Sequence, residues 1–101
     1  MDIKLTTVGS VGTVYINGRF DFKAHKFFKA AYDQLLPQKD ISHLVINLAA
    51  VSYMDSSALG MLLLVNERAQ AEGKLVELSR ANSTVRQILD IANFDKLFAI
   101  S

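Results

Sequence analysis

Segments with the two-residue period of β-strands alternate along this chain with segments that have the 3.6-residue period of helices. Residues 3–8 and 11–17 are rich in β-forming side chains and are separated by Gly9-Ser10, which predicts a hairpin whose second strand ends at Gly18. The order β-β-α-β-α-β-α predicts an α/β fold, in which helices pack on a mixed sheet of four to five strands. The remaining elements are expected as helices at 22–36, 57–72 and 82–92, strands at 44–48 and 75–78, and a last strand or packed extension at 94–100.

Local signals identify helix ends and the side chains that face the core. Pro37 and Gly73 mark the ends of the first two helices, and Asn82 is the expected N-cap of the third. The apolar run at 44–48 predicts a central strand buried on both faces. The buried stripe expected for the first helix is Ala24, Phe27, Phe28, Ala31 and Leu35. The stripe expected for the second helix is Ala58, Met61, Leu62, Val65 and Ala69.

The composition is that of a compact globular domain. The length of 101 residues predicts a single domain spanning 1–101, and a hydrophobic content of 50% with 21% charged residues excludes a disordered chain. The net charge of +1 argues against direct binding of nucleic acid or of an anionic membrane. The start of the chain lacks a signal-peptide pattern and no apolar run approaches the ~18 residues of a membrane span, so a cytoplasmic protein is expected.

The residue types that catalysis and cofactor binding require do not form a recognisable set. The chain has no cysteine, which excludes disulfides and thiolate metal sites, and its five glycines form no phosphate-binding loop. The two histidines, His25 and His43, have no carboxylate at the spacing of a metal site. No nucleophile with a base and an orienting group can be assembled, so we expect neither a metal, a cofactor nor an enzyme.

The most informative segment lies between the central strand and the second helix. Here Asp55-Ser56-Ser57 precedes an apolar helix, and Ser56 is a natural N-cap because its hydroxyl can accept a hydrogen bond from a free helix N–H. On residue chemistry alone, the start of a helix is a sufficient explanation of this segment.

The string Met54-Asp55-Ser56-Ser57-Ala58-Leu59-Gly60 resembles the signature of STAS domains, and within them it is most similar to free-standing bacterial anti-sigma factor antagonists. One departure is Ala58, where antagonists usually carry glycine; alanine is small and a good helix former, so we expect it to be tolerated. The resemblance implies a STAS-like sheet with packed helices. It extends over nearly the whole chain, through residues 18–21, 41–48, 73–76 and 85–89.

This resemblance implies a partner-switching role. The unphosphorylated antagonist binds an anti-sigma factor that is also a serine kinase, phosphorylation by that kinase inactivates it, and a metal-dependent protein serine phosphatase reverses the modification. By position, the acceptor is Ser56, while Asp21, Asp55 and Ser57 lie at the partner-binding site. The resemblance leaves open which partner is used, and some such systems act on targets other than sigma factors. The free protein is expected to be a monomer or a weak dimer.

Two leucines of the second helix are further candidates for partner binding. Leu59 and Leu63 lie off the stripe that packs on the sheet and are one helical turn apart. They either form an exposed patch beside Ser56 or are buried under the first or last helix.

An alternative function is a constitutive STAS interaction module in a lipid-transport or transporter complex, which need not be phosphorylated. In that group the corresponding segment often contains threonine and additional glycine, unlike Asp55-Ser56-Ser57-Ala58.

Overall fold

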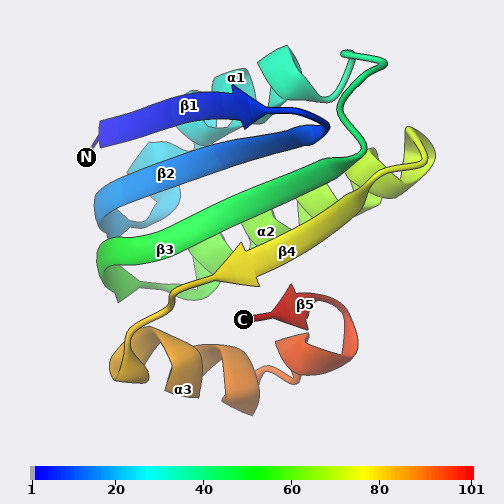
Figure 1. Cartoon of the computed structure of the whole chain (residues 1–101). Coiled ribbons are helices and arrows are strands. Elements are labelled where there is room, and N and C mark those ends of the chain that lie inside the picture. Colours follow the sequence, from blue (N-terminus) through cyan, green and yellow to red (C-terminus); the bar gives the residue numbers. More distant parts are fainter. Residues whose placement is uncertain (1) are drawn as a thin grey trace.

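A five-stranded mixed sheet with strand order β1-β2-β3-β4-β5 forms the centre of the computed structural model, which describes residues 2–101 (Figure 1). The first two strands form the expected antiparallel hairpin, and each later strand runs parallel to its neighbour. The α/β fold with a mixed sheet is therefore confirmed. The strands are β1 (Asp2–Val8), β2 (Val11–Phe20), β3 (His43–Met54), β4 (Leu75–Ser79) and β5 (Ala99–Ile100).

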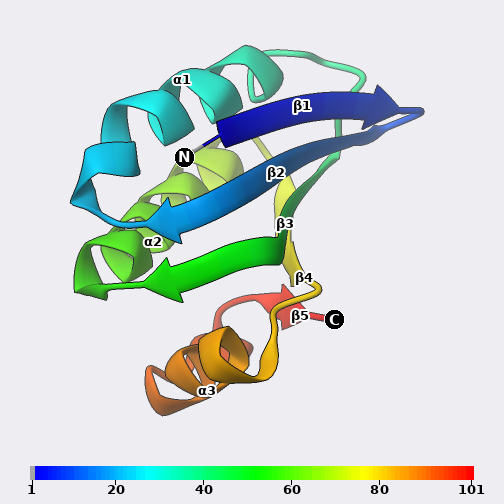
Figure 2. The ribbon, with the colours of Figure 1, turned by 90° about the vertical axis from the view of Figure 1, so that its left-hand side faces the viewer.

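Helices α1 and α2 lie on the same face of the sheet, whereas α3 lies beyond its β4–β5 end and contacts β3 (Figure 2). The core between the sheet and the two helices includes Phe20, Phe28, Leu44, Ile46 and Leu62, each fully or almost fully buried. The helical elements are the 3-10 helix η1 (Phe22–Ala24), α1 (His25–Leu35), α2 (Ser56–Ala71), α3 (Ser83–Ile91) and the 3-10 helix η2 (Phe94–Lys96).

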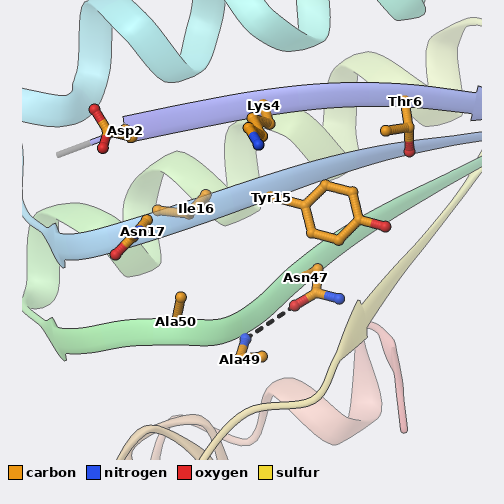
Figure 3. Close-up of a pocket in the computed structure, with 9 residues that line it drawn as sticks. All are labelled: Asp2, Lys4, Thr6, Tyr15, Ile16, Asn17, Asn47, Ala49 and Ala50. Carbon is orange, nitrogen blue, oxygen red and sulfur yellow. Dashed lines mark hydrogen bonds between the residues drawn. The ribbon is translucent and has the colours of Figure 1, made fainter.

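Two strands run further than their sequences indicate. β2 does not end at Gly18 but passes through it at a φ of +103°, next to an irregularity in the β2–β3 register, and continues to Phe20. β3 continues past Leu48 to Met54, because β2 provides a hydrogen-bonding partner for its second half. The expected burial of residues 44–48 on both faces is also wrong, since Asn47 is only partly buried and lies on the open face of the sheet (Figure 3).

The second helix matches its expected packing. All five residues of the α2 stripe are buried. At its C-terminus the Lys74 N–H donates to the Ala69 carbonyl (2.8 Å) and the Gly73 N–H to the Gln70 carbonyl (3.0 Å), with Gly73 at a φ of +71°. This pattern is a Schellman motif, which explains the glycine predicted there. The Asn82 side chain caps α3 as expected, accepting from the Val85 N–H at 2.9 Å.

The first helix differs from expectation at Phe27, which is 63% exposed. Phe27 and Tyr32 flank the apolar stripe of α1 on opposite sides, and the helix is rotated so that Tyr32 is the buried one. The guanidinium of Arg68 on α2 lies 5.7 Å from the centre of the Tyr32 ring, and it also contacts Asp33. Contacts with α2 therefore select which of the two flanking aromatic residues packs inward.

Candidate functional site

The two carboxylates expected at the site follow the ends of neighbouring parallel strands. Phe20 and Met54 are partners at the ends of β2 and β3, and the Asp55 N–H donates to the Phe20 carbonyl at 3.4 Å. Because parallel strands end at the same edge of a sheet, Asp21 and Asp55 leave it side by side. The structure thus brings together two residues that are 34 positions apart in sequence.

Asp55, and not Ser56, is the N-cap of α2. Its backbone is extended (φ −105°, ψ −177°), and its Oδ1 accepts a hydrogen bond from the Ala58 N–H at 2.9 Å. The expectation that Ser56 caps the helix is therefore wrong. A carboxylate on the preceding residue satisfies the free N–H, and Ser56 becomes the first residue of the helix.

Both serines at the start of α2 are exposed, whereas Ala58 is fully buried. The Ser56 hydroxyl is therefore accessible from solvent, at the end of a helix where free N–H groups and the helix dipole favour negative charge. The methyl group of Ala58 faces the core, so the departure from the family's usual glycine is accommodated by packing.

Asp21, directly after the end of β2, contacts both η1 and Arg19. Its Oδ1 accepts from the Lys23 N–H at 3.1 Å and so caps η1, while its Oδ2 lies 3.7 Å from Arg19 Nε. The Arg19 guanidinium in turn lies 4.4 Å from the centre of the Tyr53 ring, a cation–π contact between strand partners. Sequence reasoning did not identify Arg19 or Tyr53 as site residues, because both lie beyond the strand ends expected from the sequence and each precedes the last residue of its observed strand.

The two candidate leucines of α2 have different environments. Leu59 is partly buried and packs against the hydrophobic core, whereas Leu63 is 43% exposed. Leu63 is therefore an exposed leucine about two helical turns from Ser56. Leu59, one turn from Ser56, also contributes to packing of the core.

A hollow of about 660 Å³ lies elsewhere, on the open face of the sheet (Figure 3). Polar side chains such as Lys4, Tyr15 and Asn47 line it, and Asn47 Oδ1 accepts a hydrogen bond from the Ala49 N–H at 3.0 Å. This hollow is the concave surface of a solvated sheet face, and none of the expected site residues lines it.

Residues 2–101 show neither a membrane-spanning helix nor a cluster of metal-binding side chains. None of the helices described there is long and apolar enough to cross a membrane. The same residues contain no group of three histidine or carboxylate side chains placed to hold a metal ion.

A known family model and two known proteins are similar to this chain in sequence. The STAS domain family model matches residues 2–101. A STAS-domain containing protein of Pseudomonas aeruginosa (strain UCBPP-PA14) is 44% identical over 91 residues, which cover 88% of this chain and 86% of that protein. The anti-sigma F factor antagonist of Paenibacillus polymyxa is 24% identical over 87 residues, which cover 86% of this chain and 74% of that protein.

Solved structures show the same fold. The unphosphorylated form of the anti-sigma factor antagonist SpoIIAA superposes with a TM-score of 0.82 at 20% identity, covering 99% of this chain and 88% of that one. The STAS domain of a SulP transporter from Vibrio cholerae superposes with a TM-score of 0.72 at 25% identity, covering 95% of this chain and 77% of that one. Both antagonists and transporter domains thus share this architecture.

Proposed function

This chain belongs to the STAS domain family, and we propose that it is an anti-sigma factor antagonist whose partner binding is switched off by phosphorylation of Ser56. In this proposal residues 1–101 are one binding domain without catalytic activity. The partner is an anti-sigma factor with serine kinase activity, and a metal-dependent protein serine phosphatase restores the binding form.

The observation that carries the proposal is the position of Ser56. Its side chain is exposed on the first residue of α2, directly after a carboxylate that caps the helix, at the edge of the sheet where Asp21 follows β2. A hydroxyl at this place can enter a kinase active site without unfolding of the helix. The resemblance to antagonists supports the same position as the acceptor.

Phosphorylation at Ser56 would change charge without changing the fold. A phosphate adds about −1.5 to −2 charge and is favoured at a helix N-terminus by ~0.3–1 kcal/mol. When a partner covers the site, the same charge is desolvated close to Asp55, and a penalty of ~3 kcal/mol lowers affinity more than a hundredfold. The switch therefore acts on the interface between the two proteins.

The test is incubation with a candidate anti-sigma kinase and ATP, followed by mass spectrometry that localises the phosphate. We expect labelling of Ser56, and we expect Ser56→Ala to abolish labelling while it still binds the kinase. Ser83→Ala is the matched control, because Ser83 is likewise an exposed serine on the first residue of a helix, and it should be labelled normally. Labelling at Ser57 alone would contradict the assignment.

A constitutive module in a lipid-transport or transporter complex is the second candidate, since a transporter STAS domain shares the fold. Such a module would bind its partner equally well with serine or phosphoserine at position 56. The two functions are separated by measuring the affinity of both forms for the same partner.

A further inference from the structure

Two phenylalanine side chains are exposed near the start of α1, Phe22 on η1 and Phe27 in the first turn of α1. Phe22 is 64% exposed and Phe27 is 63% exposed, whereas the next residue, Phe28, is fully buried in the core. Single exposed apolar side chains are common, but two large exposed rings within six residues, at the same end of the sheet, offer apolar area that a partner can desolvate.

Phe27 stands between two hollows of the surface. One, of about 330 Å³, is lined by Arg19, Asp21, Lys23 and Ala24 together with Phe27. The other, of about 340 Å³, lies between β1 and α1, and Phe27 lines it together with Leu5 and Ala30. A partner surface that fits both hollows would enclose the ring between them, which is the geometry of an interface anchor.

Positive charge is concentrated around these rings. Residues 19–33 contain four cationic side chains and two carboxylates, a net charge of +2, while the rest of the chain has seven against eight, a net charge of −1. Lys29 is engaged with Asp33, but Lys23 and Lys26 are exposed, and the Arg19 side chain is 65% exposed. The small overall charge therefore conceals one basic surface.

This surface lies at the same end of the sheet as the proposed phosphorylation site. The hollow that contains Arg19 and Lys23 is also lined by Asp21, which leaves the sheet beside Asp55. Element η1 contacts α2, and Figure 2 shows the start of α1 and the start of α2 at the same end of the sheet.

We propose that Arg19, Phe22, Lys23, Lys26 and Phe27 form a docking surface, here called the basic aromatic patch, for an acidic surface of the anti-sigma partner. The proposal rests on the proposed function and adds the chemistry of the partner. Opposite charge accelerates the encounter, and the phenylalanine rings supply the buried contact. Phosphorylation of Ser56 adds about −1.5 to −2 charge at the same end of the sheet, so the phosphate that is desolvated at Ser56 also offsets the basic charge that attracts an acidic partner.

The charge component is tested with the double variant Lys23→Glu/Lys26→Glu and the kinase used to test Ser56. We expect an increase in Kd of about tenfold or more at low salt, and a weaker dependence of Kd on salt than in the unmodified protein. Lys39→Glu/Lys96→Glu is the matched control. Both lysines are exposed and lie outside the patch, and the double substitution changes the net charge by the same amount. The control should alter Kd by less than about threefold.

The apolar component is tested with Phe27→Ser, for which a loss of at least tenfold in affinity is expected with an unchanged melting temperature. Ile91→Ser is the control, since Ile91 is 76% exposed at the end of α3. If both patch variants bind the kinase as the controls do, the docking surface is wrong even when Ser56 is phosphorylated. If the kinase binds through the patch but never labels Ser56, the proposed phosphorylation is wrong and the docking surface stands.

Other anionic surfaces could also attract a basic patch. Binding is therefore measured to vesicles that contain phosphatidylserine and to a DNA duplex. Patch-dependent binding to either at physiological salt, without patch-dependent binding to the kinase, would overturn the assignment to a protein partner.

Discussion

Asp55 and Ser56 have separate roles at the start of α2. The Asp55 carboxylate caps the helix through the Ala58 N–H, and the exposed Ser56 side chain contributes little to that end of the fold. We therefore predict that Ser56→Asp weakens partner binding while it shifts the melting temperature by less than ~2 °C, because acidic residues are favoured in the first turn of a helix.

The measurement for Ser56→Asp pairs a thermal melt with a binding titration against the anti-sigma partner. Ser57→Asp places the same charge on the neighbouring exposed residue and should retain more affinity. A large fall in stability with unchanged binding would show that the residue is structural.

At the scale of elements, local signals predict helices better than they predict strand ends. The α2 stripe and the Gly73 cap follow from short-range spacing, and both are confirmed. The second half of β3 contains small and polar residues such as Ala49 and Ser52, so its strand character depends on pairing with β2. The burial of Tyr32 in place of Phe27 likewise depends on contacts with α2, and these contacts cannot be predicted from the sequence of α1 alone.

The two candidate leucines of α2 are expected to differ in function, because Leu59 packs on the core and Leu63 is exposed to a partner. We predict that Leu63→Ser costs less than ~1 kcal/mol of the free energy of unfolding but lowers partner affinity by about tenfold or more, because Leu63 is 43% exposed. Leu59→Ser, which removes a side chain packed on the core, should cost at least ~1 kcal/mol in stability. Urea unfolding and binding titrations of both variants test the separation, and equal stability losses would place Leu63 in the core.

At the scale of the whole molecule, the site depends on the register of parallel strands. Asp21 and Asp55 come together because Phe20 and Met54 are partners, and that pairing joins segments separated by α1. Hydrophobic periodicity specifies which elements exist but does not specify this register. The sequence indicated the two carboxylates only through its family resemblance, and the cation–π contact of Arg19 with Tyr53 had no sequence signal of its own.

The two helices on the covered face are tied together by ion pairs around Asp33. The Asp33 carboxylate accepts from Lys29 Nζ at 2.6 Å within α1 and from Arg68 Nη2 at 3.0 Å on α2. The hydrogen bond from Lys29 is the main cause of a pKa of Asp33 below its usual value, and the Arg68 charge adds to it.

The lowered pKa of Asp33 predicts how stability depends on pH. The native carboxylate stays ionised to lower pH than in the unfolded chain, so its contribution is complete above the ordinary value of about 4 and is lost as pH falls through the native value. We predict that Asp33→Asn lowers the free energy of unfolding by about 0.5–1 kcal/mol at pH 7, the range of partly exposed ion pairs, and that its difference from the unmodified protein narrows below pH ~4. Urea unfolding at pH 7, 5 and 3 measures this difference, with Asp40→Asn on the exposed connection to β3 controlling for the loss of one carboxylate. A difference for Asp33→Asn that stays constant across this range would mean that ionisation of the Asp33 carboxylate does not contribute to the stability of the fold.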